Sequence, residues 1–164
     1  MPKNKNKDKK NWKHRLAKFL SDDMSPYWHH FDLRPLDDLD DEGLALTLTH
    51  VKGIDMLDLN ETEITNESIK LLTKLEFIKE LRLKACRNIN DNCAEDLNKI
   101  TSLEFIHLRF TGFTIDGVLK LNALTNLKKI IFSAEGDITD KMLQLKEMLP
   151  NCEFVVNSKP YYFE

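Results

Sequence analysis

The fold of this chain is decided by residues 78–89, which read Ile-Lys-Glu-Leu-Arg-Leu-Lys-Ala-Cys-Arg-Asn-Ile. The apolar residues follow the spacing L-x-x-L-x-L-x-x-C-x-x-I. Leu81 and Leu83 alternate as in a short strand, so both side chains should point inward. Cys86 comes at a turn, where its side chain can serve backbone groups, and Ile89 returns to the core. The stretch therefore predicts a strand, a turn and a return to the core.

The same spacing recurs along the chain at intervals of 24 or 25 residues. Predicted strands start at Leu57, Leu81, Ile106, Ile130 and Phe154, with inward partners two residues later at Leu59, Leu83, Leu108, Phe132 and Val156. The residue three positions after each partner belongs to a turn: Thr62, Cys86, Thr111 or Glu135. Glu135 departs from the pattern, so we expect the fourth turn to be rebuilt.

Apolar residues between the strands recur in steps of three, which predicts helices that run into a tighter turn. The sets are Ala45, Leu48, Val51, Ile54; Ile69, Leu72, Leu75, Ile78; Ala94, Leu97, Ile100, Leu103; Val118, Leu121, Leu124, Leu127; and Met142, Leu145, Met148. Thr65, Asn90 and Thr139 are N-cap types and should start helices, and Pro150 should end the last one.

One such unit cannot bury its apolar side alone, so neighbouring units should stack. The chain is therefore predicted to be an α/β solenoid with a parallel sheet on its concave face and helices on its convex face. The predicted organisation is a disordered basic tail over residues 1–10, an N-terminal capping helix and aromatic linker over 11–30, the repeat domain over 31–157 and a C-terminal tail over 158–164.

Charge is distributed unevenly in this chain, whose net charge is −3. Residues 1–18 hold eight basic residues and one acidic residue, whereas the remainder holds 16 basic and 26 acidic residues. Trp12, Leu16, Phe19 and Leu20 recur at helical spacing, which predicts a short amphipathic helix over residues 11–20. We expect this helix to cover the first repeat, and a basic membrane-surface helix is the alternative.

The acidic stretch over residues 37–42 suggests a cation site at first sight. Its spacing does not fit an EF-hand loop. We expect Asp40 to be an N-cap instead, with Asp41 and Glu42 in the first helical turn, where the helix dipole favours them.

Several classes of protein are disfavoured by the composition. The three cysteines, Cys86, Cys93 and Cys152, indicate reduced and buried thiols rather than a disulfide framework. No apolar run is long enough to span a membrane or to form a signal peptide, so we expect an intracellular protein. No catalytic arrangement, zinc-ligand spacing or glycine-rich phosphate loop is present. We therefore expect no enzyme, no cofactor, no metal and no small-molecule substrate.

The repeats resemble the cysteine-containing leucine-rich repeats of ribonuclease-inhibitor-like proteins over about residues 31–157. Residues 82–93, with Ile138-Thr-Asp and Leu149-Pro150 downstream, are also similar to coupling factor B (subunit s) of mitochondrial ATP synthase and its assembly-factor relatives. The N-terminal segment does not share that second similarity. Both resemblances imply a small, non-catalytic protein that acts by contact.

The predicted binding surface is the concave face, on which the middle row of side chains reads Asp32, Asp58, Arg82, His107, Ile131 and Val155. This row passes from acidic through basic to apolar. We expect a protein partner, bound as by an adaptor, assembly factor or inhibitor of the immunity type, because aromatic and arginine side chains often anchor protein contacts. The alternative is that residues 1–18 bind nucleic acid or another anionic surface. The candidate partner-binding residues are Arg82, Lys84, Phe105, His107, Arg109, Phe110, Lys129, Ile131 and Val155.

Overall fold

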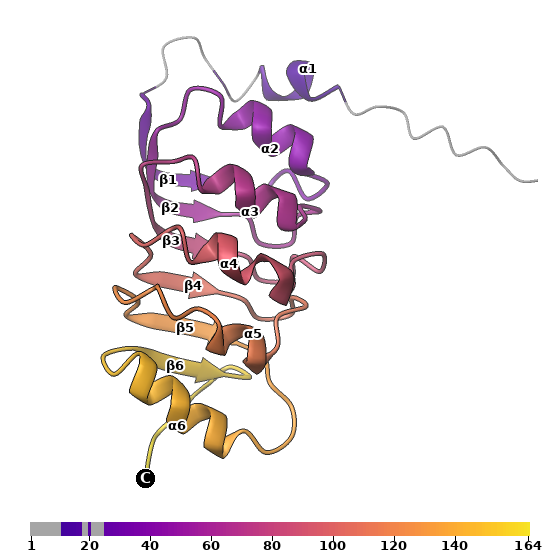
Figure 1. The fold of residues 1–164 in the computed structure, drawn as a ribbon. Helices are drawn as coiled ribbons and strands as arrows, with labels where there is room; N and C mark the ends of the chain where they lie inside the picture. The colour runs from indigo at the N-terminus through magenta and orange to yellow at the C-terminus, as the bar shows by residue number, and fades with distance from the viewer. Residues whose placement is uncertain (1–10, 18–19, 21–24) are drawn as a thin grey trace, which may run out of the picture.

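The computed structural model describes residues 11–17, 20 and 25–164. One sheet forms a single layer, and short helices cover one side of it (Figure 1). Within the described residues the elements are α1 (Trp12–Leu16), β1 (Tyr27–Asp32), α2 (Asp41–Thr47), β2 (Gly53–Asp58), α3 (Asn66–Leu72), β3 (Phe77–Arg82), a 3-10 turn (Asp91–Cys93), α4 (Ala94–Leu97), β4 (Phe105–His107), α5 (Ile115–Leu119), β5 (Lys129–Phe132), α6 (Thr139–Met148), β6 (Glu153–Val156) and β7 (Lys159–Pro160).

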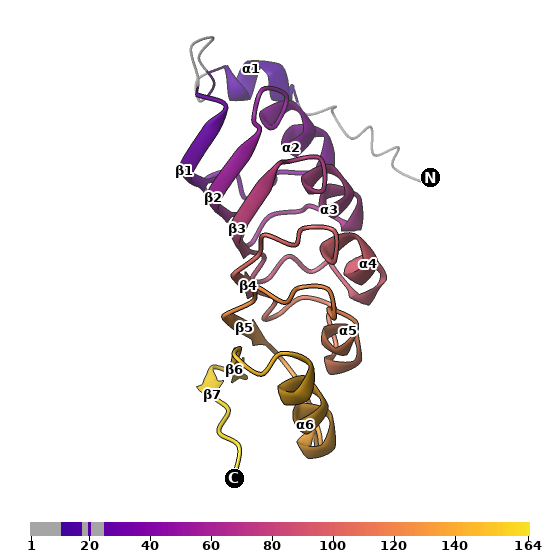
Figure 2. The same cartoon turned by 60° about the vertical axis from the view of Figure 1, so that its left-hand side comes forward.

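The seven strands lie side by side in chain order. Strands β1 to β6 are parallel, and β7 pairs antiparallel with β6. Leu57, Leu81, Ile106, Ile130 and Phe154 are confirmed as cross-strand partners, in register with Phe31 of β1. They are not the first residues of their strands, because β2 and β3 begin four residues earlier and β4, β5 and β6 begin one residue earlier. Figure 2 shows the strands on the inner side of a bowed stack and the helices on its outer side.

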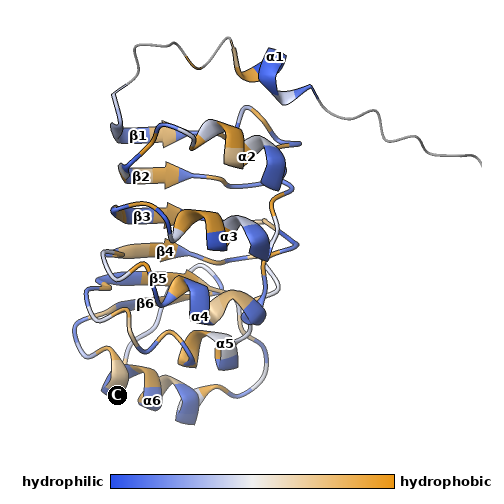
Figure 3. Ribbon diagram, turned by 45° about the horizontal axis from the view of Figure 1, so that its top comes forward, coloured by the Kyte–Doolittle hydropathy of each residue, from blue (hydrophilic) through white to orange (hydrophobic). Residues whose placement is uncertain are grey.

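The core lies between the sheet and the helices. Both predicted inward residues of each of these five units are buried, although Leu59, Leu83 and Leu108 lie one residue beyond the ends of β2, β3 and β4. Most members of the predicted helical sets are also buried. Figure 3 shows largely hydrophobic strands and helices of mixed character, as expected for helices with one buried side. One position is wrong: Ala45 is exposed and Leu44 is buried. The helix starts after Asp40, and this phase directs Leu44 toward the core.

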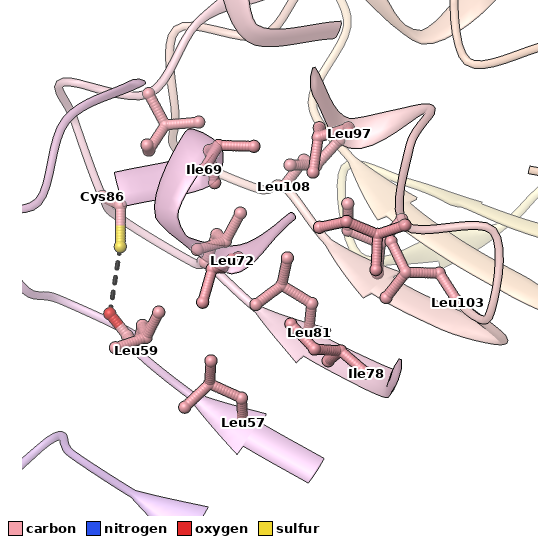
Figure 4. Packing of buried hydrophobic residues seen from close by; sticks show 14 of the residues in the cluster. Leu57, Leu59, Ile69, Leu72, Ile78, Leu81, Cys86, Leu97, Leu103 and Leu108 are labelled. Carbon is pink, nitrogen blue, oxygen red and sulfur yellow. Dashed lines mark hydrogen bonds between the residues drawn. The ribbon is translucent and has the colours of Figure 1, made fainter. Parts of the chain in front are cut away.

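The turns after the strands use the predicted side chains. The Cys86 thiol donates to the Leu59 carbonyl of the preceding unit at 3.0 Å (Figure 4). The hydroxyls of Thr62 and Thr111 donate to carbonyls three residues back at 2.8 and 2.7 Å. The turn near Glu135 is rebuilt, since the Asn157 amide bonds to both the backbone N–H and the carbonyl of Ala134.

Three of the four predicted N-caps are confirmed. The side chains of Asp40, Thr65 and Asn90 each accept a backbone N–H from the first turn of the following helix or 3-10 turn. Thr139 is not an N-cap but the first residue of α6. Asp137 accepts both its N–H and its hydroxyl, at 3.0 and 2.8 Å.

Neighbouring units are joined by hydrogen bonds between equivalent positions. Asp41 accepts the backbone N–H and the hydroxyl of Thr65, 24 residues later, at 2.9 and 2.7 Å. The Asn60 side chain accepts the backbone N–H of Lys84 at 2.8 Å, also 24 residues away. These hydrogen bonds connect equivalent positions of neighbouring units.

The N-terminal helix spans Trp12–Leu16 within the described residues, and it packs as expected. Trp12 and Leu16 are buried in the core cluster, and Arg15 makes two bonds of 2.7 Å to Asp38. This packing disagrees with a free membrane-surface helix. The predicted contribution of Phe19 and the tail over residues 1–10 lie outside the described residues.

The two ends of the predicted repeat domain need correction. The aromatic linker is part of the sheet, because β1 begins at Tyr27 and Tyr27 and Trp28 pair with Gly53 and Ile54. The segment over residues 158–164 is not a free tail either: it forms β7, and Tyr161 and Phe163 pack against the core. Both segments lacked the apolar alternation by which the inner strands were found.

Candidate functional site on the open face of the sheet

The outward side chains of β1 to β6 and of the residues just after each strand form what we call the open face. Helices cover the opposite side of the sheet (Figure 2). Charges on the open face fall into three regions, and the regions differ in how far their charges are paired.

The end at β1 and β2 is acidic but internally neutralised. Arg34 donates to both Asp32 oxygens at 2.9 and 2.7 Å. Its Nε also lies 3.5 Å from Asp58 Oδ2. The hydrogen bonds from Arg34 lower the pKa of Asp32 below its ordinary value. These acids therefore already have a cationic partner.

The edge where the strands begin carries ion pairs of alternating sign. Asp55 lies 2.9 Å from His29 Nδ1 and 2.5 Å from Lys79 Nζ. Further along, Glu104 pairs with Lys128, and Lys129 pairs with Glu153 at 3.1 Å. Opposite charges in adjacent positions offset one another, so this edge presents little net charge.

The centre of the open face brings together Arg82, Lys84, Phe105, His107, Arg109 and Phe110, which we call the basic–aromatic patch. The Arg82 guanidinium carbon lies 5.0 Å from the centroid of the Phe105 ring, and that of Arg109 lies 4.1 Å from the Phe110 centroid. The rings of Phe105 and His107 meet edge to face at 6.5 Å. Six of the nine predicted binding residues thus form one cluster.

Positive charge in the patch is only partly offset. Arg82 has Glu80 at 3.2 Å and Lys84 has Glu61 at 3.5 Å. Among the described residues, no carboxylate lies within 4.0 Å of the Arg109 guanidinium. The Nε atoms of Arg82 and Arg109 are buried and have no hydrogen-bond partner there, so an outside carboxylate would meet the other guanidinium nitrogens. The patch can therefore accept carboxylates from outside the chain.

His107 lies among these cations and is half-buried. Burial, with the charges of Lys84, Arg82 and Arg109, lowers its pKa to about 4. Its Nε2 has no hydrogen-bond partner among the described residues. The imidazole is therefore neutral at pH 7, and protonation would add a fourth positive charge to the patch.

His107 makes stability depend on pH. Its folded pKa, about 4, is below the ordinary 6.5, so between these values the unfolded chain binds a proton that the folded chain does not. Stability is therefore lost as pH falls below about 6.5. Allowing for solvent screening, we expect about 1 kcal/mol of loss from this residue at pH 5. Urea unfolding at pH 7.5 and 5.0 should show a smaller loss for His107→Gln. Equal losses in both proteins would contradict this prediction.

The other three predicted site residues lie outside the patch. Lys129 is engaged with Glu153, and Ile131 is half-buried. We expect Val155 to be exposed from the sequence, but it is only 8 % exposed in the structure. Val155 lies in β6, the first strand of the C-terminal hairpin, and pairs with Pro160 of β7. The apolar end of the open face is smaller than the sequence predicted.

Two features of the patch were missed at the sequence level. Glu80 lies 3.2 Å from Arg82 and is not among the predicted binding residues. Phe110 is a predicted binding residue, but its left-handed backbone, with φ of 60°, does not follow from the sequence pattern. A glycine or asparagine would have signalled that conformation, and neither occurs at this position.

The three cysteines are structural. Cys86, Cys93 and Cys152 are free and buried. Burial raises the pKa of Cys93 and of Cys152 to about 12, so both thiols remain protonated at neutral pH. Within the described part of the chain, no group of three or more histidine, cysteine or acidic side chains could hold a metal ion.

The residues placed by the structure include no helix with the length and apolar character needed to cross a membrane. Comparison of the whole chain with protein-family models and with curated proteins found no match.

Proposed function

We propose that this chain is a leucine-rich repeat protein of the cysteine-containing type and that it acts without catalysis, by binding another protein on the open face. The repeat assignment is supported by the cross-strand register and by the bond from the Cys86 thiol to the preceding unit. Adaptor, assembly factor and inhibitor are three forms of this one activity.

The observation that carries the proposal is the basic–aromatic patch itself. Its cations are incompletely paired, whereas those at both neighbouring regions of the open face have acidic partners. Arginine and aromatic side chains on a rigid sheet are suited to anchoring a protein contact. A stacked repeat scaffold holds them in fixed relative positions.

The test is affinity capture of partners from the source organism, followed by titration of the identified partner with purified variants. Phe105→Ala should weaken binding by about 1–2 kcal/mol if it is a hot spot. Lys70→Ala and Lys120→Ala, on exposed positions of the helical side, are controls that should leave the affinity unchanged. Loss of binding in the controls but not in Phe105→Ala would show that the open face is not the contact.

Nucleic-acid binding through residues 1–18 is the second candidate, and its basis is the excess of seven positive charges in that segment. Arg15 is engaged with Asp38, which removes one of those charges from a free basic surface. Titration of RNA and DNA at increasing salt tests this candidate, because phosphate contacts weaken steeply with salt. Absence of binding at low salt removes it.

A further inference from the structure

Phe110 occupies a backbone conformation that does not suit it. Strands β2, β3 and β4 are each followed by a residue with positive φ: Glu61 at 65°, Ala85 at 59° and Phe110 at 60°. In this region the Cβ atom crowds the following carbonyl oxygen, and a bulky residue is an outlier. At Glu61 and Ala85 the backbone N–H bonds to a carbonyl of the next unit, and at Phe110 it donates to the Ser133 hydroxyl at 3.4 Å.

The Phe110 ring makes few contacts that would stabilise the folded state and offset this backbone strain. The residue is 52 % exposed and does not belong to the core cluster. The Arg109 guanidinium is stacked on the Phe110 ring, with its carbon 4.1 Å from the ring centroid. Glycine or asparagine would adopt this backbone conformation with less strain. A phenylalanine at such a position points to a function for its side chain.

The positive charges beside Phe110 indicate the chemical character of the partner that its ring would contact. Arg109 has no carboxylate partner among the described residues, and Arg82 and Lys84 are only partly neutralised. These three cations all act on His107, so they lie around one point of the patch. An exposed ring next to incompletely paired cations complements a segment that combines apolar side chains with carboxylates.

We propose that Phe110 and Arg109 form the anchor by which the open face holds an acidic segment of a partner protein. Phe110 packs against an apolar side chain of that segment, and Arg109 pairs with its carboxylates, supported by Arg82 and Lys84. This inference rests on the proposed protein-binding function and adds to it the chemical class of the partner.

The first probe is a library of synthetic 15-residue peptides in which about a third of the residues are aspartate or glutamate around a central leucine. A counterpart library carries lysine in place of every acid. We expect the full chain to bind members of the acidic library in fluorescence polarisation. Equal or tighter binding of the lysine library, or no binding of the acidic library, overturns the proposal.

Two substitutions separate an anchoring role from a structural one. Phe110→Asn should reduce affinity for the bound peptide by at least about tenfold, while the melting temperature stays unchanged or rises by up to about 4 °C. Asparagine tolerates the left-handed region, so it removes the ring without adding strain. Leu143→Asn is the matched control, because Leu143 is 51 % exposed but lies on α6. A lower melting temperature for Phe110→Asn with unchanged affinity overturns the proposal.

Arg109→Gln tests the charge. It should lower affinity by about tenfold and flatten the salt dependence of binding, whereas Arg87→Gln, at an exposed position after Cys86, should do neither. A single-stranded DNA 20-mer is measured in parallel. Binding of that DNA which depends on Arg109 but not on Phe110 overturns the assignment to a protein segment.

Measurements with Phe105→Ala, Phe110→Asn and Arg109→Gln on a captured partner distinguish the loss of the anchor from the loss of the whole open face as a contact. A captured partner that loses affinity with Phe105→Ala but not with Phe110→Asn or Arg109→Gln leaves the open face as the contact and removes the anchor. A captured partner that responds to none of the three removes the open face as well.

Discussion

Replacing Trp12 with alanine should lower the free energy of unfolding by about 3–5 kcal/mol, the usual cost of removing a buried tryptophan. Trp12 is 1 % exposed, although it lies in a helix of only five residues. A Cβ atom at Gly43 would lie 2.7 Å from the indole, so the absence of a side chain there lets the ring pack directly on α2. The first unit thus depends on a side chain that precedes the sheet in the sequence.

The measurement is chemical denaturation followed by circular dichroism. Lys13→Ala is the control, because Lys13 belongs to the same helix but is exposed, and it should leave the midpoint unchanged. A Trp12→Ala protein with the wild-type midpoint would show that α1 does not cap the stack.

Replacing Leu83 with alanine should cost about 2–5 kcal/mol. Leu83 is fully buried, and its backbone N–H donates to the His107 carbonyl of the next unit at 2.9 Å. It lies in the middle of the stack, where neighbouring units on both sides would keep open the cavity that the substitution to alanine creates. The backbone bonds leave the surroundings little freedom to collapse into the space.

Denaturation midpoints again provide the measurement for Leu83→Ala. Arg87→Ala changes an exposed residue four positions later and should have almost no effect. A loss below about 1 kcal/mol for Leu83→Ala would mean that the core relaxes around the missing side chain, contrary to the packing described.

The inner strands could be predicted from the sequence because the signal for each is local and repeated. Leu81 and Leu83 show the alternation of a half-buried strand, and the same pair recurs at a constant interval. The role of Cys86 followed from its place in that interval, and the structure shows its thiol bonded to Leu59.

The ends of the sheet could not be predicted in this way. Strand β1 reads Tyr-Trp-His-His-Phe-Asp and owes its place to pairing with β2 rather than to its own pattern. The C-terminal hairpin turns at Asn157 and Ser158, both with positive φ, and no glycine marks the turn. Burial of Val155 depends on such tertiary neighbours, which a pattern of apolar residues does not describe.

Most of the candidate site follows from the alternation of the strands, which places Arg82, Phe105 and His107 on one side. How their charges are shared does not follow. The sequence does not indicate that Lys129 pairs with Glu153 while Arg109 has no acidic partner among the described residues, because those pairings depend on cross-strand distances.

The cross-unit bonds from Asp41 to Thr65 and from Asn60 to Lys84 have a consequence for how the molecule opens. Each unit is held mainly by the units before and after it, whereas a unit at either end has a neighbouring unit on one side only and a short terminal segment on the other. Amide hydrogens should therefore exchange with deuterium fastest at the two ends and slowest in β3 and β4. These slow strands carry Arg82, Phe105 and His107, so a partner would dock on the part of the sheet that opens least often, and binding would require little further ordering of the backbone.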